Sequence, residues 1–98
     1  MLIDRNGSMT QYVPFNKRAW HAGDSIFDHC PDCNNFSIGI ELEGEDEMPY
    51  ESVQYLRLAE VTKTIMANWP VITRNRIVGH CDISPGRKND PGPSFDWD

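Results

Sequence analysis

The sequence predicts an α/β fold, because segments with the two-residue period of a β-strand alternate with one that has the period of an α-helix. The expected order is a hairpin in residues 1–14, a strand in 37–44, a helix in 51–69 and a short strand in 77–80. The chain has 98 residues, which is enough for one domain with a small hydrophobic core. No repeat or low-complexity tract divides it.

The hairpin is predicted by the dipeptide Asn6-Gly7, which lies between the two short runs 2–4 and 10–13. Asparagine followed by glycine readily takes the positive φ angles of a tight β-turn. We therefore expect these two runs to pair with each other as antiparallel strands.

A long loop is expected in residues 14–36, and loops of this length in compact domains are usually functional or disordered. The side chains of Trp20 and His21 favour a functional loop. The loop also contains a Cys-x-x-Cys pair, Cys30 and Cys33, but without the strand and helix that a redox motif needs. The chain has three cysteines, an odd number, and we expect reduced thiols.

The strand at residues 37–44 alternates between apolar and other side chains. Its apolar face carries Ile38, Ile40 and Leu42. Two carboxylates, Glu41 and Glu43, share the opposite face with Gly39. This strand therefore presents a pair of acidic groups on one side of the predicted sheet.

The helix at residues 51–69 is the clearest element, because its apolar side chains recur at helical spacing. The stripe consists of Tyr55, Leu58, Ala59, Thr62, Ile65, Met66 and Trp69. Three polar residues, Gln54, Arg57 and Lys63, lie away from the stripe, and Pro70 ends the helix. The β-branched run 77–80 then predicts a strand that delivers His80 to the rim of the sheet.

The charge of the chain excludes some classes of partner. Lysine and arginine number 9 against 15 aspartates and glutamates, for a formal charge of −6. Nucleic acid and anionic membranes need a clustered basic face, so neither is an expected partner. The sequence has neither a run of about 18 apolar residues nor the pattern of a signal peptide, and we expect a soluble, cytoplasmic protein.

The last part of the chain carries the clearest chemistry. His80 and Asp90 lie on either side of a turn fixed by Pro85 and Gly86, and Lys88 comes two residues before the aspartate. A catalytic zinc takes three protein ligands and leaves a fourth position for water. His80 and Asp90 can therefore supply two of the three ligands.

Each of these residues also has a structural interpretation. His80 alone could be a packed histidine at a strand end, since most histidines bind no metal. Asp90, before Pro91, could be an ordinary turn residue. Lys88 could form a solvated pair with Arg87.

Four segments, 11–15, 18–23, 34–44 and 79–93, resemble the type 2 N-acetylmuramoyl-L-alanine amidases, in particular the cytoplasmic enzymes that act on anhydromuramoyl-peptides. The resemblance extends over essentially all 98 residues, with the motifs in the same order. It implies a mixed central β-sheet flanked by helices. It also implies a Zn²⁺ cofactor and a small-molecule muropeptide as the substrate.

The resemblance assigns roles to matching positions. His80 and Asp90 would be zinc ligands, Glu41 the carboxylate that acts on the metal-bound water, and Lys88 the donor to the developing oxyanion. Trp20 would contact the anhydromuramoyl-peptide. A carboxylate within hydrogen-bond reach can carry a proton from water to the leaving amine, and an ammonium stabilises the charge of a tetrahedral intermediate.

The sequence departs from the family in two ways. The family's first zinc-ligand histidine lies before the segment that matches Leu2 to Phe15, and relatives continue beyond Asp98 into a further helix, so we expect residues 1–98 to be a single partial amidase domain. The position before the second cysteine is often a substrate-binding arginine in the family. Here it is Asp32.

Alternatives remain open for several residues. Glu43 competes with Glu41, because both lie on the same strand face. Trp20 could be a core aromatic, and His21 is interpreted as structural. A second, structural zinc site could form from His29, Cys30, Cys33 and Cys81, because Cys-x-x-Cys is a common half-site.

The function expected from these features is a zinc-dependent amidase. It would hydrolyse the bond between N-acetylmuramic acid, or its anhydro form, and L-alanine in muropeptide recycling. The alternatives are a non-catalytic muropeptide-binding module and an inactive fragment. The combination of His80, Asp90, Lys88 and Glu41 favours the enzyme.

Overall fold

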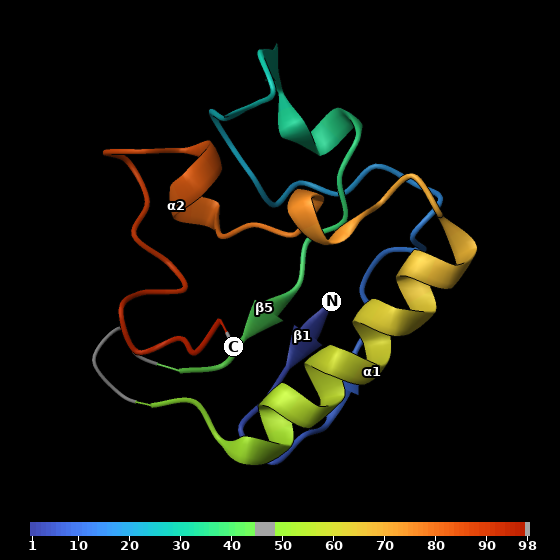
Figure 1. The fold of residues 1–98 in the computed structure, drawn as a ribbon, viewed down its shortest axis with the longest axis vertical. Helices are drawn as coiled ribbons and strands as arrows, with labels where there is room; N and C mark the ends of the chain where they lie inside the picture. Colours follow the sequence, from blue (N-terminus) through green and yellow to red (C-terminus); the bar gives the residue numbers. More distant parts are fainter. Residues whose placement is uncertain (45–48, 98) are drawn as a thin grey trace.

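The central sheet has the strand order β2-β1-β5 and is mixed, in a computed structural model that describes residues 1–44 and 49–97. β1 (Leu2–Ile3) pairs antiparallel with β2 (Met9–Thr10) and parallel with β5 (Glu41–Leu42). Figure 1 shows α1 (Ser52–Asn68) passing alongside β1. The predicted α/β fold is therefore confirmed.

The hairpin turn between β1 and β2 is held by the Asp4 carboxylate, which accepts hydrogen bonds from the backbone N–H groups of Asn6 and Ser8 at 3.2 and 3.0 Å. Gly7 has φ 88°, a conformation that favours glycine. A Cβ atom on Gly7 would lie 2.6 Å from Cγ2 of Val53, so the turn packs closely against α1. The predicted hairpin is confirmed.

Helix α1 agrees with the predicted helix, but its buried face differs from the predicted stripe: Ala59 of the stripe is exposed, and a polar residue is buried. Gln54, expected to lie away from the apolar stripe, is fully buried at 0% exposure. Its Nε2 donates to the carbonyls of Glu43 at 2.8 Å and Ile3 at 3.3 Å, and its Oε1 accepts from the N–H of Glu51 at 2.8 Å. The amide is buried because it pairs backbone groups at the ends of two strands and at the start of the helix.

The expected loop at 14–36 contains short elements of its own. β3 (Ile26–Phe27) and β4 (Cys30–Pro31) form a second, two-stranded antiparallel sheet, and a 3₁₀ turn, η1 (Cys33–Asn35), follows. The side chains of Cys33 and Asn34 at the start of η1 are buried. This loop is therefore anchored to the domain through η1.

The predicted strand at 77–80 is wrong. After the 3₁₀ turn η2 (Arg74–Arg76), the chain runs without regular structure into a short helix, α2 (His80–Ile83). Ile77 and Val78 are both 39% exposed, so their β-branched side chains do not pack within a sheet. His80 is the first residue of α2 and not the last residue of a strand.

The end of the chain packs against α1 through four aromatic rings: Tyr50, Tyr55, Phe95 and Trp97. The hydroxyl of Tyr50 donates to the carbonyl of Pro91 at 2.8 Å. This contact fixes the backbone directly after Asp90. No helix in residues 1–44 and 49–97 is long and apolar enough to cross a membrane.

Candidate functional site

A cleft of about 270 Å³ brings together residues from the loop before β3, from η1 and from the region of α2. Its walls are formed by Trp20, His21, Ala22, Gly23, Asn34, His80, Arg87 and Lys88. Three residues that the sequence singled out, Trp20, His80 and Lys88, thus share one cleft. They are up to 68 positions apart in the chain.

His80 and Asp90 face each other at the edge of this cleft. Nδ1 of His80 lies 3.3 Å from Oδ2 of Asp90, and Nε2 lies 2.7 Å from the carbonyl oxygen of Ala22. A carbonyl only accepts hydrogen bonds, so Nε2 carries the proton in this contact. In the neutral imidazole, Nδ1 then holds the lone pair that a metal ion binds.

This pair fits the donor set of zinc. Imidazole nitrogen and carboxylate oxygen are both zinc ligands, and a ligating histidine almost always donates its other N–H to a carbonyl or carboxylate. The Ala22 carbonyl fills that position for His80. Within residues 1–44 and 49–97, no group of three or more His, Cys, Asp or Glu side chains could hold a metal ion. The described residues therefore offer two candidate ligands, one fewer than the three that a catalytic zinc takes.

The second zinc site suggested by the Cys-x-x-Cys spacing does not form. His29, Cys30, Cys33 and Cys81 all lie in the described part of the chain, where no such metal-binding group exists. Cys33 is buried, whereas Cys30 is exposed. The half-site is not assembled, because β4 and η1 present the two cysteines to different environments. All three cysteines are free thiols, as expected.

The two strand carboxylates have different surroundings. Oε1 of Glu43 accepts a hydrogen bond from the backbone N–H of Arg5 at 2.8 Å, which ties it to the β1–β2 turn. Glu41 lies in β5, where it pairs with Leu2, and its side chain is exposed. Glu41 is not one of the residues that line the cleft. Its role in proton transfer stays a prediction.

His21 lies between the cleft and the segment that leads into β5. Its Nε2 is 3.1 Å from Oγ of Ser37, and a Cβ atom on Gly39 would lie 2.6 Å from Cγ of the ring. Burial lowers the pKa of His21, opposed by the hydrogen bond with Ser37 and reinforced by the neighbouring His80. These contacts fit the structural role expected for His21.

Trp20 is 81% exposed, so its interpretation as a core aromatic is wrong. The guanidinium of Arg18 lies 3.9 Å from the centre of its ring, a cation–π contact. The ring forms part of the cleft wall beside His80 and Lys88. An exposed, flat ring in this place can contact a ligand.

Arg87 and Asn34 are site residues that the sequence analysis missed. The sequence suggests only a solvated pair of Arg87 and Lys88, but the side chain of Arg87 donates to the carbonyls of Ala22 at 2.6 Å and Asp24 at 3.2 Å. Oδ1 of Asn34 accepts from the N–H groups of His21 and Ala22. Both lie within the quoted motifs, but no pattern of spacing reveals a contact with a distant backbone group.

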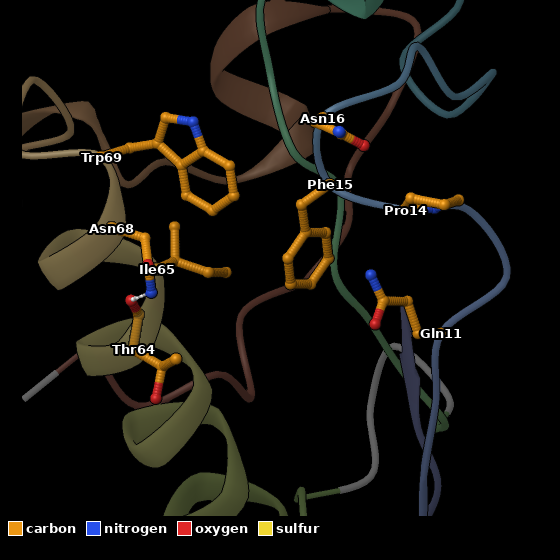
Figure 2. A pocket seen from close by; sticks show the side chains of 8 residues that line it. All are labelled: Gln11, Pro14, Phe15, Asn16, Thr64, Ile65, Asn68 and Trp69. Carbon is orange, nitrogen blue, oxygen red and sulfur yellow. Dashed lines mark hydrogen bonds between the residues drawn. The ribbon is translucent and has the colours of Figure 1, made fainter.

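A second cavity, of about 410 Å³, lies between the segment after β2 and the end of α1 (Figure 2). Its walls are Gln11, Pro14, Phe15, Asn16, Thr64, Ile65, Asn68 and Trp69. Phe15 and Trp69 meet edge to face, with ring centres 6.3 Å apart. None of these side chains is an acid, a base or a metal ligand, so the cavity offers no hydrolytic chemistry.

The sequence profile of the Amidase_2 family, described as N-acetylmuramoyl-L-alanine amidase, matches residues 1–93. The chain belongs to this amidase family. It is 61% identical over 97 residues to the 1,6-anhydro-N-acetylmuramyl-L-alanine amidase AmpD of Haemophilus influenzae, a match that covers 99% of this chain and 53% of the relative. The chain thus spans about half the length of the curated relatives it matches.

Solved amidase structures agree with the fold. A crystal structure of a selenomethionine AmpD derivative superposes with a TM-score of 0.95 at 56% identity, covering 98% of this chain and 53% of that one. The Escherichia coli amidase AmiD, in complex with the substrate anhydro-N-acetylmuramic acid-L-Ala-D-γ-Glu-L-Lys, gives a TM-score of 0.90 at 37% identity, covering 98% and 43%. The amidase fold is therefore shared over nearly all of this chain.

Proposed function

We propose that this chain provides part of the active site of a zinc-dependent amidase, which hydrolyses the bond between N-acetylmuramic acid, in its anhydro or ordinary form, and L-alanine. The observation that carries the proposal is the pair of His80 Nδ1 and Asp90 Oδ2, 3.3 Å apart. The other imidazole nitrogen is already bound to the Ala22 carbonyl. Substrate complexes of related amidases with muropeptides support the substrate class.

The residues would divide the reaction between them. His80 and Asp90 would hold the zinc ion. When bound, zinc polarises the scissile carbonyl and lowers the pKa of a coordinated water toward ~7. Glu41 would accept a proton from the attacking water and pass it to the nitrogen of the leaving L-alanine. Water adds across the C–N bond, leaving a carboxylate on the sugar and an amine on the peptide.

Lys88 and Trp20 would act on the substrate directly. Lys88 lines the cleft beside His80, where its ammonium can stabilise the negative charge that develops on the carbonyl oxygen. The exposed ring of Trp20 offers an apolar surface to the sugar or to the peptide stem. The cleft thus combines an apolar wall with a cation next to the proposed zinc ligands.

The test uses the full gene product that contains this chain. Its zinc content is measured, together with the release of free amine from anhydro-N-acetylmuramic acid-L-Ala-D-γ-Glu-L-Lys. We expect a chelator to abolish hydrolysis and zinc to restore it, and Asp90→Ala to lower both zinc content and rate. Glu60→Gln is the matched control, because this carboxylate pairs with Arg57 on the surface of α1. It should change neither quantity.

Two results would contradict the proposal in different ways. Full activity after complete removal of metal would exclude the zinc mechanism. Binding of the muropeptide without hydrolysis, in the metal-loaded protein, would favour the non-catalytic binding module.

A further inference from the structure

The carbonyl oxygen of Ala22 is in hydrogen-bond contact with two side chains that line the cleft, those of His80 and Arg87. Ala22 is 1% exposed, so its carbonyl has to find its partners within the protein. A carbonyl oxygen has two lone pairs. One faces Nε2 of His80 at 2.7 Å, and the other faces Nη2 of Arg87 at 2.6 Å.

The same peptide segment is held from its amide side. Oδ1 of Asn34, which is 6% exposed, accepts from the N–H of His21 at 2.9 Å and from the N–H of Ala22 at 2.8 Å. Asn34 belongs to η1, whereas His80 and Arg87 belong to the region of α2. Ala22 is therefore clamped between two elements that are distant in the sequence.

Arg87 makes further contacts that fix its guanidinium. Nε donates to the carbonyl of Asp24 at 3.2 Å, and Oγ of the buried Ser84 donates to the same carbonyl at 2.7 Å. A Cβ atom at position 23 would lie 2.7 Å from Nη2 of Arg87, so glycine gives the guanidinium the space it occupies. The guanidinium bridges two carbonyls of the loop from a single planar group.

We propose that Arg87 is a positioning residue for His80. By holding the Ala22 carbonyl in place, Arg87 keeps His80 in the tautomer with the proton on Nε2 and directs the Nδ1 lone pair toward Asp90. The metal-related part of this inference rests on the proposed function, whereas the tautomer is a property of this chain alone. The hydrogen bonds that the structure shows for the Arg87 guanidinium go to the carbonyls of Ala22 and Asp24 and to Oγ of Ser84, and not to Asp90. Arg87 can therefore act on the proposed metal site only through the loop.

The physical reason is that the tautomer of a histidine is set by the hydrogen bond of its other nitrogen. Without the guanidinium, the Ala22 carbonyl loses one partner and residues 22–24 lose their bridge to α2. The carbonyl can then move away from Nε2, and the imidazole can rotate or place its proton on Nδ1. A proton on Nδ1 would block that nitrogen as a metal ligand.

The experiment compares Arg87→Met with the unchanged protein, using the full gene product labelled with ¹⁵N. At about pH 8.5, the nitrogen shifts of His80 report which ring nitrogen carries the proton. We expect the unchanged protein to show His80 protonated on Nε2. Arg87→Met should add a measurable Nδ1-protonated population and lower zinc affinity, measured by chelator competition, by about 10–100-fold.

Two further variants complete the design. Arg57→Met is the matched control, because Arg57 pairs with Glu60 on the exposed face of α1. It should leave the tautomer and zinc affinity unchanged. Arg87→Lys should restore part of the affinity, since an ammonium can donate to the Ala22 carbonyl but lacks the fork that also reaches Asp24.

The outcomes separate this inference from the proposed function. If the unchanged protein binds no zinc but Arg87→Met still shifts the tautomer, the positioning role stands and the zinc mechanism fails. If Arg87→Met leaves both the tautomer and zinc affinity as in Arg57→Met, the positioning role is overturned. Should Arg87→Met fail to fold, Arg87→Lys gives the same comparison. An unchanged protein with His80 protonated on Nδ1 would overturn the inference by itself.

Discussion

The side-chain amide of Gln54 donates to the backbone carbonyl of Glu43 at 2.8 Å, in a position that is fully buried. The same amide group reaches the carbonyl of Ile3 at 3.3 Å. One polar side chain of α1 therefore holds the ends of both β1 and β5. Glu41, the proposed proton carrier, lies in β5, so its position depends on this contact.

Replacing Gln54 with leucine should destabilise the domain. The change leaves the carbonyl of Glu43 and the N–H of Glu51 without the partners that Gln54 supplies, whereas the carbonyl of Ile3 keeps its hydrogen bond from the N–H of Glu43. Each buried unsatisfied group costs about 1–3 kcal/mol. We expect a loss of about 2–4 kcal/mol in the free energy of unfolding, measured by urea denaturation. Gln11→Leu, at an exposed position, should change it by less than about 0.5 kcal/mol. Equal effects of the two substitutions would show that the buried contacts of Gln54 contribute nothing.

Substitution of the two strand carboxylates, Glu41 and Glu43, should lower the activity to different extents. In the full gene product, Glu41→Gln should lower kcat by about two to four orders of magnitude, the range for loss of a general acid–base group, and leave zinc content intact. Glu43→Gln should do much less, because Glu43 is bound to the N–H of Arg5 at 2.8 Å, which an amide oxygen can still accept. Steady-state kinetics with the muropeptide measure the difference. The reverse order would mean that Glu43 is the proton carrier.

Substitution of Gly23 and Gly86 by alanine should separate backbone strain from crowding. Both glycines have positive φ angles, 64° and 80°, so either alanine costs about 1–2 kcal/mol of strain. A Cβ atom at Gly86 meets nothing within 4 Å, whereas one at Gly23 meets Arg87. We therefore expect Gly23→Ala to lose more stability than Gly86→Ala, and a loss of zinc affinity only in Gly23→Ala. Equal zinc affinity in the two variants would show that Arg87 can move without effect.

His21 should make the stability of the domain depend on pH. Burial lowers the pKa of His21 in the folded state, so the unfolded chain binds this proton first as the pH falls. The contribution of His21 is fully present above about pH 6.5, the ordinary histidine value, and is lost as the pH falls toward the lower folded pKa. Urea denaturation at pH 7.5 and 5.5 should show a smaller loss of stability on acidification in His21→Asn. The same loss in both proteins would contradict the lowered pKa.

The sequence predicted the elements whose signals are local. The turn at Asn6 and Gly7 and the helix from Ser52 to Asn68 depend on residues close together in the chain, and both are confirmed. The strand predicted from Ile77 to His80 failed because β-branched residues favour a strand only where a partner strand is available. Here the chain turns into α2 instead.

The contacts that shape the site are the least predictable from sequence. The contact between Gln54 and Ile3 joins two residues that are 51 positions apart in the chain. The contact between Arg87 and Ala22 spans 65 positions. Helical periodicity places Gln54 on the polar face. Its burial is favourable because its amide pairs with the carbonyls of Ile3 and Glu43 and with the N–H of Glu51. The ligand chemistry of zinc singles out His80 and Asp90 in the sequence, and the structure brings the two side chains to 3.3 Å from each other; their role as zinc ligands stays a prediction. No comparable pattern identifies a residue that acts through a backbone carbonyl.

The polypeptide of residues 1–98, studied by itself, should be weakly stable or self-associating. Its accessible surface is 6965 Å², whereas a compact monomer of 11.2 kDa is expected to expose roughly 5,700 Å². The excess, on the order of 1,300 Å², is larger than the ~800 Å² that each partner buries in a standard interface. β5 also lies at the edge of the sheet formed by the described residues, and an edge strand readily pairs with another chain. Thermal unfolding combined with sedimentation at several concentrations tests this: a monomer that melts cooperatively above about 60 °C, the upper part of the mesophilic range, would contradict the prediction.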